Sequence, residues 1–521
     1  MKFGFVSFFP FRPHVDNAVY LSKVLTEAGH ECFFLTCNKE LDSCYNLETK
    51  KGSKKLECIK CKLGGIHSYK EVSNIEHLNS KTVKDASRKE QSYFREMIKS
   101  SIGTIYHVQS DSELNDEEYI DVSNKLANSA KIVYNRTIDW VASNNIDGVI
   151  CFNGRMDILN AVISACKDEK IPFITTESTW FGNGLSLMPN SNCLSLEPWN
   201  LLNDEFKDKP LTHEQAIHAS SIIYKRLFKK SHLEWRQYNI DTIKMEAWEV
   251  SGQKVVILPS SRSEFIGSKE YEGNWANDCT KGFEEIINYL NIPYKNCILK
   301  AHPIWNETVF GIKGKKEEKY YRDWCAEKEI FFIDSSSRID SFDLMSKADI
   351  VLINGSSAAI EGGILGKVVI CSTSMIYQNA GFTIHVTNKD DLFKLDKIQT
   401  NKSEVIRSTL RFLYTSNRRV AQFVDSVRGL KVTKNKYYEG ADAQIIIDTI
   451  MSGKLVPYDI YYAESSEFES EIINSIINGS WDSISNYDLA DLSGKKELLI
   501  KKYWFYKVLD VLRNFLPRGD N

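Results

Sequence analysis

The sequence predicts an α/β protein with two doubly wound, Rossmann-like domains that face a cleft, followed by a C-terminal helical tail. Three observations support this fold class. The chain has 521 residues, which is too many for one hydrophobic core. Strand-like and helix-like segments alternate in two successive series along the chain. The strand-like segments are apolar nearly throughout, as expected when helices cover both faces of a parallel sheet.

The first series is assigned to a domain at residues 1–248, which also carries a helical insertion. Apolar residues at helical spacing end just before Gly29, a typical helix stop, so a β-α-β unit opens the chain. The expected elements are a strand at 2–9, a helix at 16–28, a strand at 31–37, a mostly helical region at 81–145, a strand at 147–155, a helix at 156–170, a strand at 171–178 and a long helix at about 213–247.

The second series is assigned to a domain at residues 249–455, and the tail to residues 456–521. Beyond about residue 455 the β/α alternation gives way to acidic and polar segments. The expected elements are strands at 254–261, 296–302, 329–335, 349–355 and 367–373, helices at 279–290, 341–348 and 356–366, and a Lys/Glu-rich helix before the third of these strands.

Composition bounds the kind of protein. Hydrophobic residues make up 42% and charged residues 26%, which is typical of a soluble globular protein. The net charge is −3, so no overall attraction to nucleic acid is expected. No apolar run reaches the ~18 residues of a membrane span. The N-terminal apolar run is interrupted by Pro10, Arg12 and Pro13, which favours a strand over a signal peptide. A cytoplasmic protein with mostly reduced cysteines is therefore expected.

Three segments of the second series follow predicted strands directly: Ser260–Glu264, Lys300–Pro303 and Asn354–Glu361. The carboxyl ends of parallel strands meet at one edge of a sheet, so these segments are expected to converge there. Each also has an ordinary explanation. A strand-end histidine such as His302 often caps or packs, and a Ser-Ser pair before a helix is often only an N-cap.

The segment NGSSAAIEGG favours a binding role. Gly355, Ser356 and Ser357 place N–H groups and hydroxyls at a predicted helix N-terminus, which suits a phosphate. Glu361 lies one turn into that helix and could accept hydrogen bonds from ribose hydroxyls. The alternative for Glu361 is a solvated helix residue.

The order of these motifs resembles a known group of enzymes. An acidic motif followed by His-Pro and then Ser-Ser is similar to GT-B transferases with cytidine-nucleotide donors, namely bacterial sialyltransferases, β-Kdo transferases of capsules and, more distantly, teichoic-acid glycerophosphotransferases. The flanking residues look most like capsule or O-antigen polysaccharide biosynthesis proteins. The resemblance covers roughly residues 150–385, and the segments that carry it are CFNGR (151–155) with Glu177, LPSSRSEF (258–265), KAHP (300–303), residues 340–370 and Tyr377.

In such relatives the segment that matches SSRSE often contains Asp-Glu. Here Ser263 stands at the first of these positions and only Glu264 is acidic. This departure argues against a double displacement that uses the missing aspartate as its nucleophile.

The resemblance implies sugar transfer from a nucleotide-activated donor to a hydroxyl group, without a cofactor for catalysis. Lys300, His302 and the Ser356–Ser357 helix start would stabilise the departing nucleoside phosphate. Glu264 would act as base on the acceptor hydroxyl, or would stabilise oxocarbenium character. The second domain would then hold the nucleotide-sugar.

In the first domain, four residues follow predicted strands and are expected to face the cleft, where they would hold the acceptor or the sugar. His14 and Asp16 follow the first strand, and Arg155 and Glu177 follow later ones. The alternative for Asp16 is the N-cap of the helix that comes next.

A separate cluster contains Cys37, Cys44, Cys58 and Cys61, the last two in a C-x2-C motif followed by Gly64 and Gly65. Four thiolates in such a segment could hold a structural zinc ion tetrahedrally. The alternative is a set of unpaired thiols.

The last segment, residues 495–518, is basic and amphipathic, with seven Lys and Arg against two acidic residues. Aromatic and aliphatic residues recur in it largely at helical spacing. Such a helix suits the lipid interface and predicts a peripheral contact with the inner membrane. The alternative is a helix that packs on the protein with its lysine heads in water.

The combined expectation is a cytoplasmic GT-B glycosyltransferase of bacterial surface polysaccharide synthesis. The expected donor is a CMP-linked ulosonic acid and the expected acceptor a growing polysaccharide or a lipid-linked molecule. The alternatives are a UDP-hexose-dependent transferase, a UDP-sugar epimerase of the same fold, and a non-catalytic scaffold of a synthesis complex.

Overall fold

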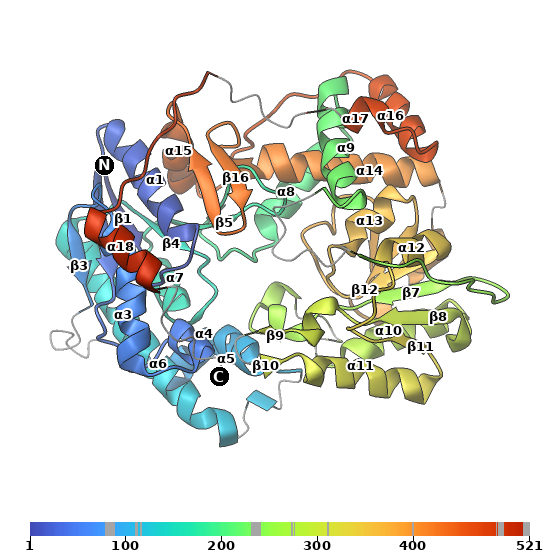
Figure 1. The fold of residues 1–521 in the computed structure, drawn as a ribbon, viewed down its shortest axis with the longest axis horizontal. Coiled ribbons are helices and arrows are strands. Elements are labelled where there is room, and N and C mark those ends of the chain that lie inside the picture. The colour runs from blue at the N-terminus through green and yellow to red at the C-terminus, as the bar shows by residue number, and fades with distance from the viewer. Residues whose placement is uncertain are drawn as a thin grey trace.

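Two large β-sheets, each covered by helices, organise the described part of the chain (Figure 1). The computed structural model describes residues 1–78, 89–109, 113–114, 117–230, 241–271, 273, 275, 277–309, 312–398, 401–485, 487 and 494–513. None of the described helices is both long and apolar enough to cross a membrane.

The first sheet has the strand order β15-β6-β5-β4-β1-β2-β3. Strands β1 to β5 run parallel, β6 is antiparallel to β5 at one edge, and β15 pairs antiparallel with β6. Its strands are β1 (Lys2–Val6), β2 (Glu31–Thr36), β3 (Ile75–His77), β4 (Gly148–Phe152), β5 (Phe173–Ser178), β6 (Leu185–Pro189) and β15 (Ala421–Gln422). Read from β3, the first six strands follow the doubly wound order 3-2-1-4-5-6, which reverses direction between β1 and β4.

The second sheet is parallel throughout, with the order β11-β8-β7-β12-β13-β14. Its strands are β7 (Val255–Leu258), β8 (Cys297–Lys300), β11 (Phe331–Ile333), β12 (Ile350–Ile353), β13 (Val368–Cys371) and β14 (Thr383–His385). The order is again 3-2-1-4-5-6, and here it reverses between β7 and β12. Ligands of such sheets bind outside the carboxyl ends of the strands at this reversal.

Helices bury both faces of each sheet, which explains the uniformly apolar strands. In β7, Val256 and Leu258 belong to one hydrophobic core, whereas Val255 and Ile257 belong to the core on the opposite face. The first-domain helices are α1 (His14–Glu27), α2 (Tyr45–Lys50), α3 (Lys54–Gly64), α4 (Gln91–Met97), α5 (Lys99–Tyr106), α6 (Glu117–Asn144) and α7 (Asp157–Asp168). Those that follow are α8 (Glu197–Phe206), α9 (His213–Leu227), α10 (Cys279–Tyr289), α11 (Lys315–Lys328), α12 (Ser341–Lys347) and α13 (Ala358–Ile364).

Two Rossmann-like domains that face each other form the GT-B-like fold class that the sequence predicts, so this prediction is confirmed.

The chain returns to the first sheet after the second domain. Helix α14 (Lys402–Tyr414) leads into a π-helical turn, and β15 then pairs with β6. A hairpin of β16 (Val427–Lys431) and β17 (Lys434–Tyr437) follows, and α15 (Gln444–Ser452) lies against β5 and β6. The return thus begins inside the range 249–455 that the sequence assigns to the second domain.

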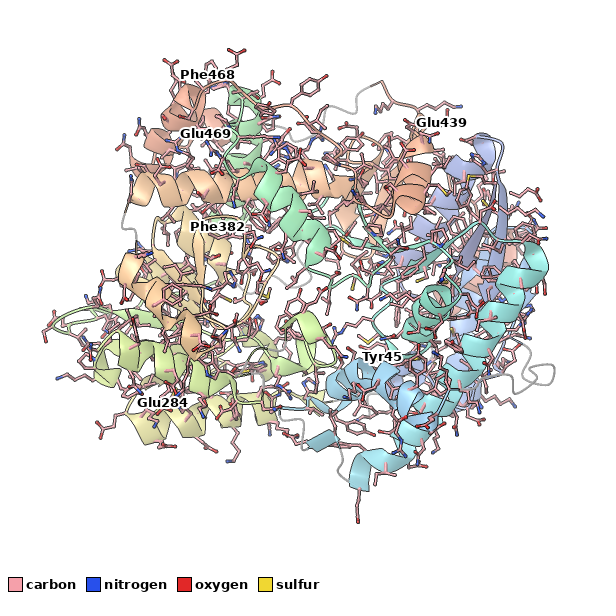
Figure 2. All side chains as sticks on the ribbon, turned by 180° about the vertical axis from the view of Figure 1, so that it is seen from behind. Tyr45, Glu284, Phe382, Glu439, Phe468 and Glu469 are labelled. Carbon is pink, nitrogen blue, oxygen red and sulfur yellow. The ribbon has the colours of Figure 1, made fainter. Side chains whose placement is uncertain are left out.

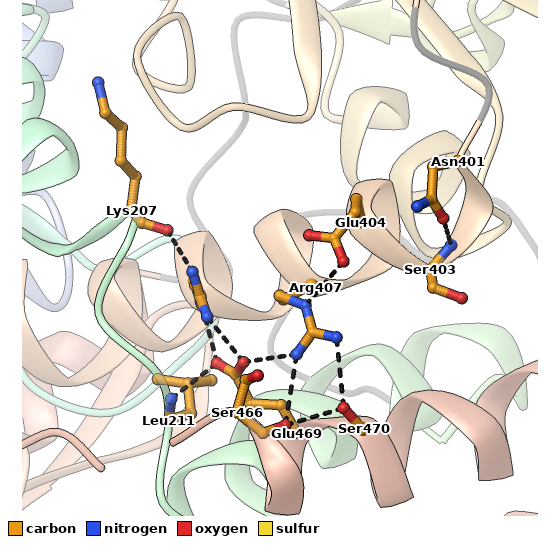
Figure 3. Close-up of polar contacts among 10 residues, drawn as sticks. Lys207, Leu211, Asn401, Ser403, Glu404, Arg407, Ser466, Glu469 and Ser470 are labelled. Atoms are coloured by element: carbon orange, nitrogen blue, oxygen red, sulfur yellow. Dashed lines mark hydrogen bonds and ion pairs between the residues drawn. The ribbon is translucent and has the colours of Figure 1, made fainter. Parts of the chain in front are cut away.

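The tail contains α16 (Glu467–Ile477), α17 (Asp482–Ser485) and α18 (Trp504–Arg513). Glu469 fastens α16 to its neighbours and is only 1% exposed (Figures 2 and 3). Its carboxylate accepts hydrogen bonds from Arg407 at 2.9 Å, from Arg411 at 2.8 Å and from the backbone N–H of Leu211 at 2.7 Å. These contacts join the tail to α14 and to the start of α9.

The helix expected at about 213–247 is shorter than the sequence suggests, and that prediction is wrong. Helix α9 ends at Leu227, because Lys229 adopts a left-handed conformation with φ 58°. Residues 244–250 have no regular secondary structure, and residues 231–240 lie outside the described part of the chain.

Candidate functional site

A cavity of about 1280 Å³ lies between the two domains and is lined by residues of both. The carboxyl ends of the strands in both sheets supply its walls, as the doubly wound topology requires. Tyr45 of α2, on the first-domain side, is one of its lining residues (Figure 2).

The predicted strand ends of the second domain converge on this cavity. The residues that line it are Glu264 after β7, Lys300 and His302 at the end of β8, and Ser356, Ser357 and Glu361 after β12. Asn354 ties two of these loops together, because its Oδ1 accepts the backbone N–H of Ser260 at 2.7 Å. The convergence that the sequence predicts for these strand ends is therefore found at one wall of the cavity.

His302 both caps a helix and lines the cavity. It is the N-cap of the 3-10 turn η6 (Pro303–Asn306), where its Nδ1 accepts the backbone N–H of Ile304 at 3.2 Å. Burial, followed by the charge of Lys300, lowers the pKa of His302 to about 4. The ring is therefore neutral at pH 7, and with Nδ1 as acceptor the proton resides on Nε2, which can donate a hydrogen bond.

Lys300 places a positive charge in the same wall. Its side chain is 4% exposed and lines the cavity. Within the described part of the chain, its ammonium group makes no hydrogen bond, although Asp340 and Asp334 act on it electrostatically. Burial lowers the pKa of Lys300 from its ordinary value. A buried ammonium that faces a cavity is suited to an anionic ligand.

In the Ser-Ser segment, the N-cap residue Ser357 makes no capping bond with its side chain, whereas Ser356 binds the first helical N–H. Ser356 Oγ accepts the backbone N–H of Ala358 at 3.2 Å, and α13 has only seven residues. Gly355 has φ 113°, and a Cβ there would approach Phe265 Cζ to 2.9 Å, so this position requires glycine. Ser356 and Ser357 nevertheless line the cavity.

Glu361 is not a solvated helix residue, since it is only 8% exposed. It forms an ion pair with Arg226, near the end of α9, and Arg226 also lies over the ring of Phe181 at 5.3 Å. Both members of the pair line the cavity. Sequence reasoning missed Arg226, because the overlong helix predicted at 213–247 concealed the helix end that brings it here.

Glu264 lies in the 3-10 turn η3 (Arg262–Glu264), and its side chain is open to the cavity. Desolvation by the enclosing walls raises the pKa of Glu264 to about 7. The charge of Arg155 opposes this effect, and that of Glu317 adds to it. A carboxyl group with this pKa is suited to proton transfer at neutral pH.

The opposite wall belongs to the first domain. His14 Nε2 lies 3.5 Å from Glu177 Oε1, and the His14 ring stacks on Phe152 with centroids 3.9 Å apart. Glu177 is held by Asn153, whose Nδ2 donates to its Oε2 at 3.0 Å. Burial lowers the pKa of His14, although the charge of Glu177 opposes this shift. His14 and Glu177 face the cleft as the sequence suggests.

Asp16 and Arg155 occupy other positions than the cavity wall. Helix α1 begins at His14, so Asp16 lies in its first turn and the N-cap interpretation is wrong. Asp16 instead binds Arg12 at 2.9 Å and accepts a hydrogen bond from the Tyr69 hydroxyl. Arg155 joins the two domains, because its Nη2 donates to the backbone carbonyl of Ser263 at 2.9 Å.

The four cysteines of the proposed zinc cluster, all in the described part of the chain, form no disulfide bond. Cys61 donates to the backbone carbonyl of Phe8 at 3.3 Å, and burial raises the pKa of Cys37 to about 11. Among the described residues, which include Cys44 and Cys58, no three His, Cys, Asp or Glu side chains come together as a metal site. Cys44 lies close enough to Cys37 and Cys61 for their charges to act on it, so the structural zinc expected at these thiols stays a prediction.

No known family model and no curated protein sequence matches this chain. Among solved structures it is similar to Thermosulfurimonas dismutans KpsC, a beta Kdo 2,4 transferase, with 14% identity, 64% of this chain and 87% of that chain covered, and a TM-score of 0.33. It is also similar to a UDP-GlcNAc 2-epimerase of Methanocaldococcus jannaschii, with 13% identity and a TM-score of 0.29. That match covers 77% of this chain and 93% of the epimerase chain. A third similar structure is the spinosyn rhamnosyltransferase SpnG, with 11% identity and a TM-score of 0.27. That match covers 79% of this chain and 95% of the SpnG chain. Nothing about the activity of this chain follows from TM-scores this low.

Proposed function

We propose that this protein is a glycosyltransferase that moves a sugar from a nucleotide-activated donor to an acceptor hydroxyl. The observation that carries the proposal is the pairing of two unlike walls across one cavity. One wall offers the buried ammonium of Lys300 and the neutral ring of His302, which suit a phosphate. The other offers His14 and Glu177, which suit hydroxyl groups. The volume of about 1280 Å³ exceeds that of an ordinary single-ligand pocket and leaves room for two substrates.

The acceptor oxygen would attack the anomeric carbon of the donor and give its proton to Glu264. The bond between that carbon and the phosphate oxygen would break, and the phosphate would keep the electron pair. Lys300 and His302 would stabilise the charge that develops on this leaving group. Glu177 is the second carboxylate in reach of the cavity and the rival candidate for the base.

We further propose a CMP-linked ulosonic acid as donor and a polysaccharide or lipid-linked acceptor, in bacterial surface polysaccharide synthesis. This finer assignment rests on the order of the acidic, His-Pro and Ser-Ser motifs. A UDP-hexose donor would place its diphosphate against the same lysine and neutral histidine.

Thermal unfolding with CMP, CDP, UDP and GDP tests the proposal. The correct nucleotide at a hundredfold excess over its Kd stabilises the fold by about 2.7 kcal/mol. Lys300→Met should abolish this shift, whereas Lys254→Met, at the opposite end of the same sheet, should preserve it.

A shift with UDP alone would indicate a UDP-sugar donor. Epimer formation from a UDP-sugar without acceptor would indicate an epimerase, and no shift with any nucleotide would indicate a scaffold.

A further inference from the structure

The segment before α18 is built into the first domain. Leu498 is buried in a first-domain core, and its backbone N–H donates to Tyr437 at 2.9 Å. Tyr503 donates likewise to the backbone carbonyl of Ser68 at 3.0 Å, and Lys502 lies over the ring of Tyr69 at 5.4 Å. Helix α18 therefore starts from a fixed position and packs beside α3 (Figure 1).

Although it packs on α3, α18 leaves large apolar side chains in solvent. Trp504 is 75% exposed, and Phe505 and Val508 are exposed as well. Trp504 and Val508 are one helical turn apart and so share a face. Aromatic residues on an exposed helix face are typical of the region between lipid headgroups and acyl chains.

Exposed lysines lie on α18 and in the segment that leads into α3. Lys501, just before α18, and Lys507, on α18, are exposed, and so are Lys50, Lys51, Lys54 and Lys55 in the adjoining α2–α3 segment. Lys50 also lines the cavity between the domains. Exposed lysines are thus found both at the cavity wall and in the segment whose helix α3 packs beside α18.

We propose that α3 and α18 form a docking face for an anionic lipid bilayer, with Trp504, Phe505 and Val508 entering the headgroup region. Charge complementarity selects this occupant, because lysines around an apolar helix face attract anionic lipids. The inference deepens the proposed function, on which its purpose rests: docking would hold the cavity mouth next to a lipid-linked acceptor.

Flotation of the full-length chain with vesicles tests this surface without any assay of activity. Binding to phosphatidylcholine vesicles that contain phosphatidylglycerol is expected at low salt, with weak binding to pure phosphatidylcholine. Trp504→Ser should lower the partition coefficient by about tenfold. Tyr461→Ser is the matched control, since Tyr461 is 74% exposed elsewhere on the molecule.

The charge component has its own pair of variants. Lys55→Gln, in the first turn of α3, should lower the partition coefficient by about fivefold, because each lysine near an anionic surface contributes about 1 kcal/mol. Lys281→Gln, in the first turn of α10, should leave it unchanged.

Absence of flotation by the full chain, or equal losses in test and control variants, would overturn the proposal. Concentration-dependent dimers that Trp504→Ser abolishes, without flotation, would assign the face to a second copy instead. A nucleotide-induced thermal shift in a chain that does not float would leave the proposed function intact.

Discussion

Arg155 Nη2 donates a hydrogen bond to the backbone carbonyl of Ser263 at 2.9 Å and so fixes the residue immediately before Glu264. Arg155 follows β4 of the first domain, whereas Ser263 follows β7 of the second. The same guanidinium reaches Ser100 Oγ at 3.3 Å and Thr104 Oγ1 at 3.1 Å, both on α5. The position of the candidate base therefore depends on contact between the domains.

Arg155→Gln should change the pH dependence of activity. The positive charge of Arg155 opposes the rise in the pKa of Glu264, so its removal moves that pKa above about 7. A smaller fraction of Glu264 is then ionised at pH 7, and the rising limb of kcat/KM shifts to higher pH. The groups that act on Glu264 are Arg155 and Glu317, and Lys300 and His302 line the same cavity.

A pH–rate profile of kcat/KM measures this shift. Arg136→Gln is the control, because Arg136 lies on α6 and pairs with Glu76 rather than with a cavity residue. If Arg155→Gln lowers activity equally at every pH, Arg155 acts only on the fold and this prediction fails.

Glu264→Gln should lower turnover by about 10² to 10⁴, the usual contribution of a positioned base. The glutamine amide keeps the size of the side chain but cannot take up the proton of the acceptor hydroxyl. Nucleotide affinity, measured by calorimetry, should change little because the charge proposed to contact phosphate belongs to Lys300. Glu177→Gln serves as the comparison: full turnover in Glu264→Gln with a collapse in Glu177→Gln would assign the base to Glu177.

His302→Ala should slow transfer by about 100-fold, by analogy with the loss of one preorganised hydrogen-bond donor. The pKa of His302 is lowered to about 4, so the ring stays neutral from pH 6 upward and contributes no limb to the profile there. Single-turnover kinetics with the folded variant, checked by circular dichroism, measure the loss. Unchanged transfer would leave His302 as the cap of η6 only.

Much of this architecture is predictable from local sequence pattern. The all-apolar runs of β7, β8 and β12 mark strands with both faces buried, and parallel topology then brings Lys300, His302 and Glu264 to one edge. These inferences need only the chain order and the period of the apolar residues.

Other parts of the site depend on contacts that no local pattern encodes. Arg226 forms its ion pair with Glu361 near the end of α9, which ends because Lys229 adopts a left-handed conformation. The local sequence pattern does not predict this helix end. Strand β15 has two residues, Ala421 and Gln422, and is a strand only because β6 lies beside it. The C-x2-C motif that suggests zinc lies within helix α3, which its spacing alone does not reveal.

Glu469→Gln should destabilise the second half of the molecule. Its carboxylate neutralises two arginines, Arg407 and Arg411, of which Arg411 is buried with it. Removal of one partner from a buried ion pair leaves uncompensated charge and typically costs about 3–5 kcal/mol. Chemical denaturation should therefore show an earlier unfolding transition.

Glu404→Gln is the matched control, because Glu404 also contacts Arg407, at 3.3 Å, but is about half exposed, at 51%. Exposed ion pairs contribute only about 0–1 kcal/mol, so Glu404→Gln should unfold almost as the native chain does. Equal and small shifts in the two variants would show that α16 is held by its apolar contacts alone.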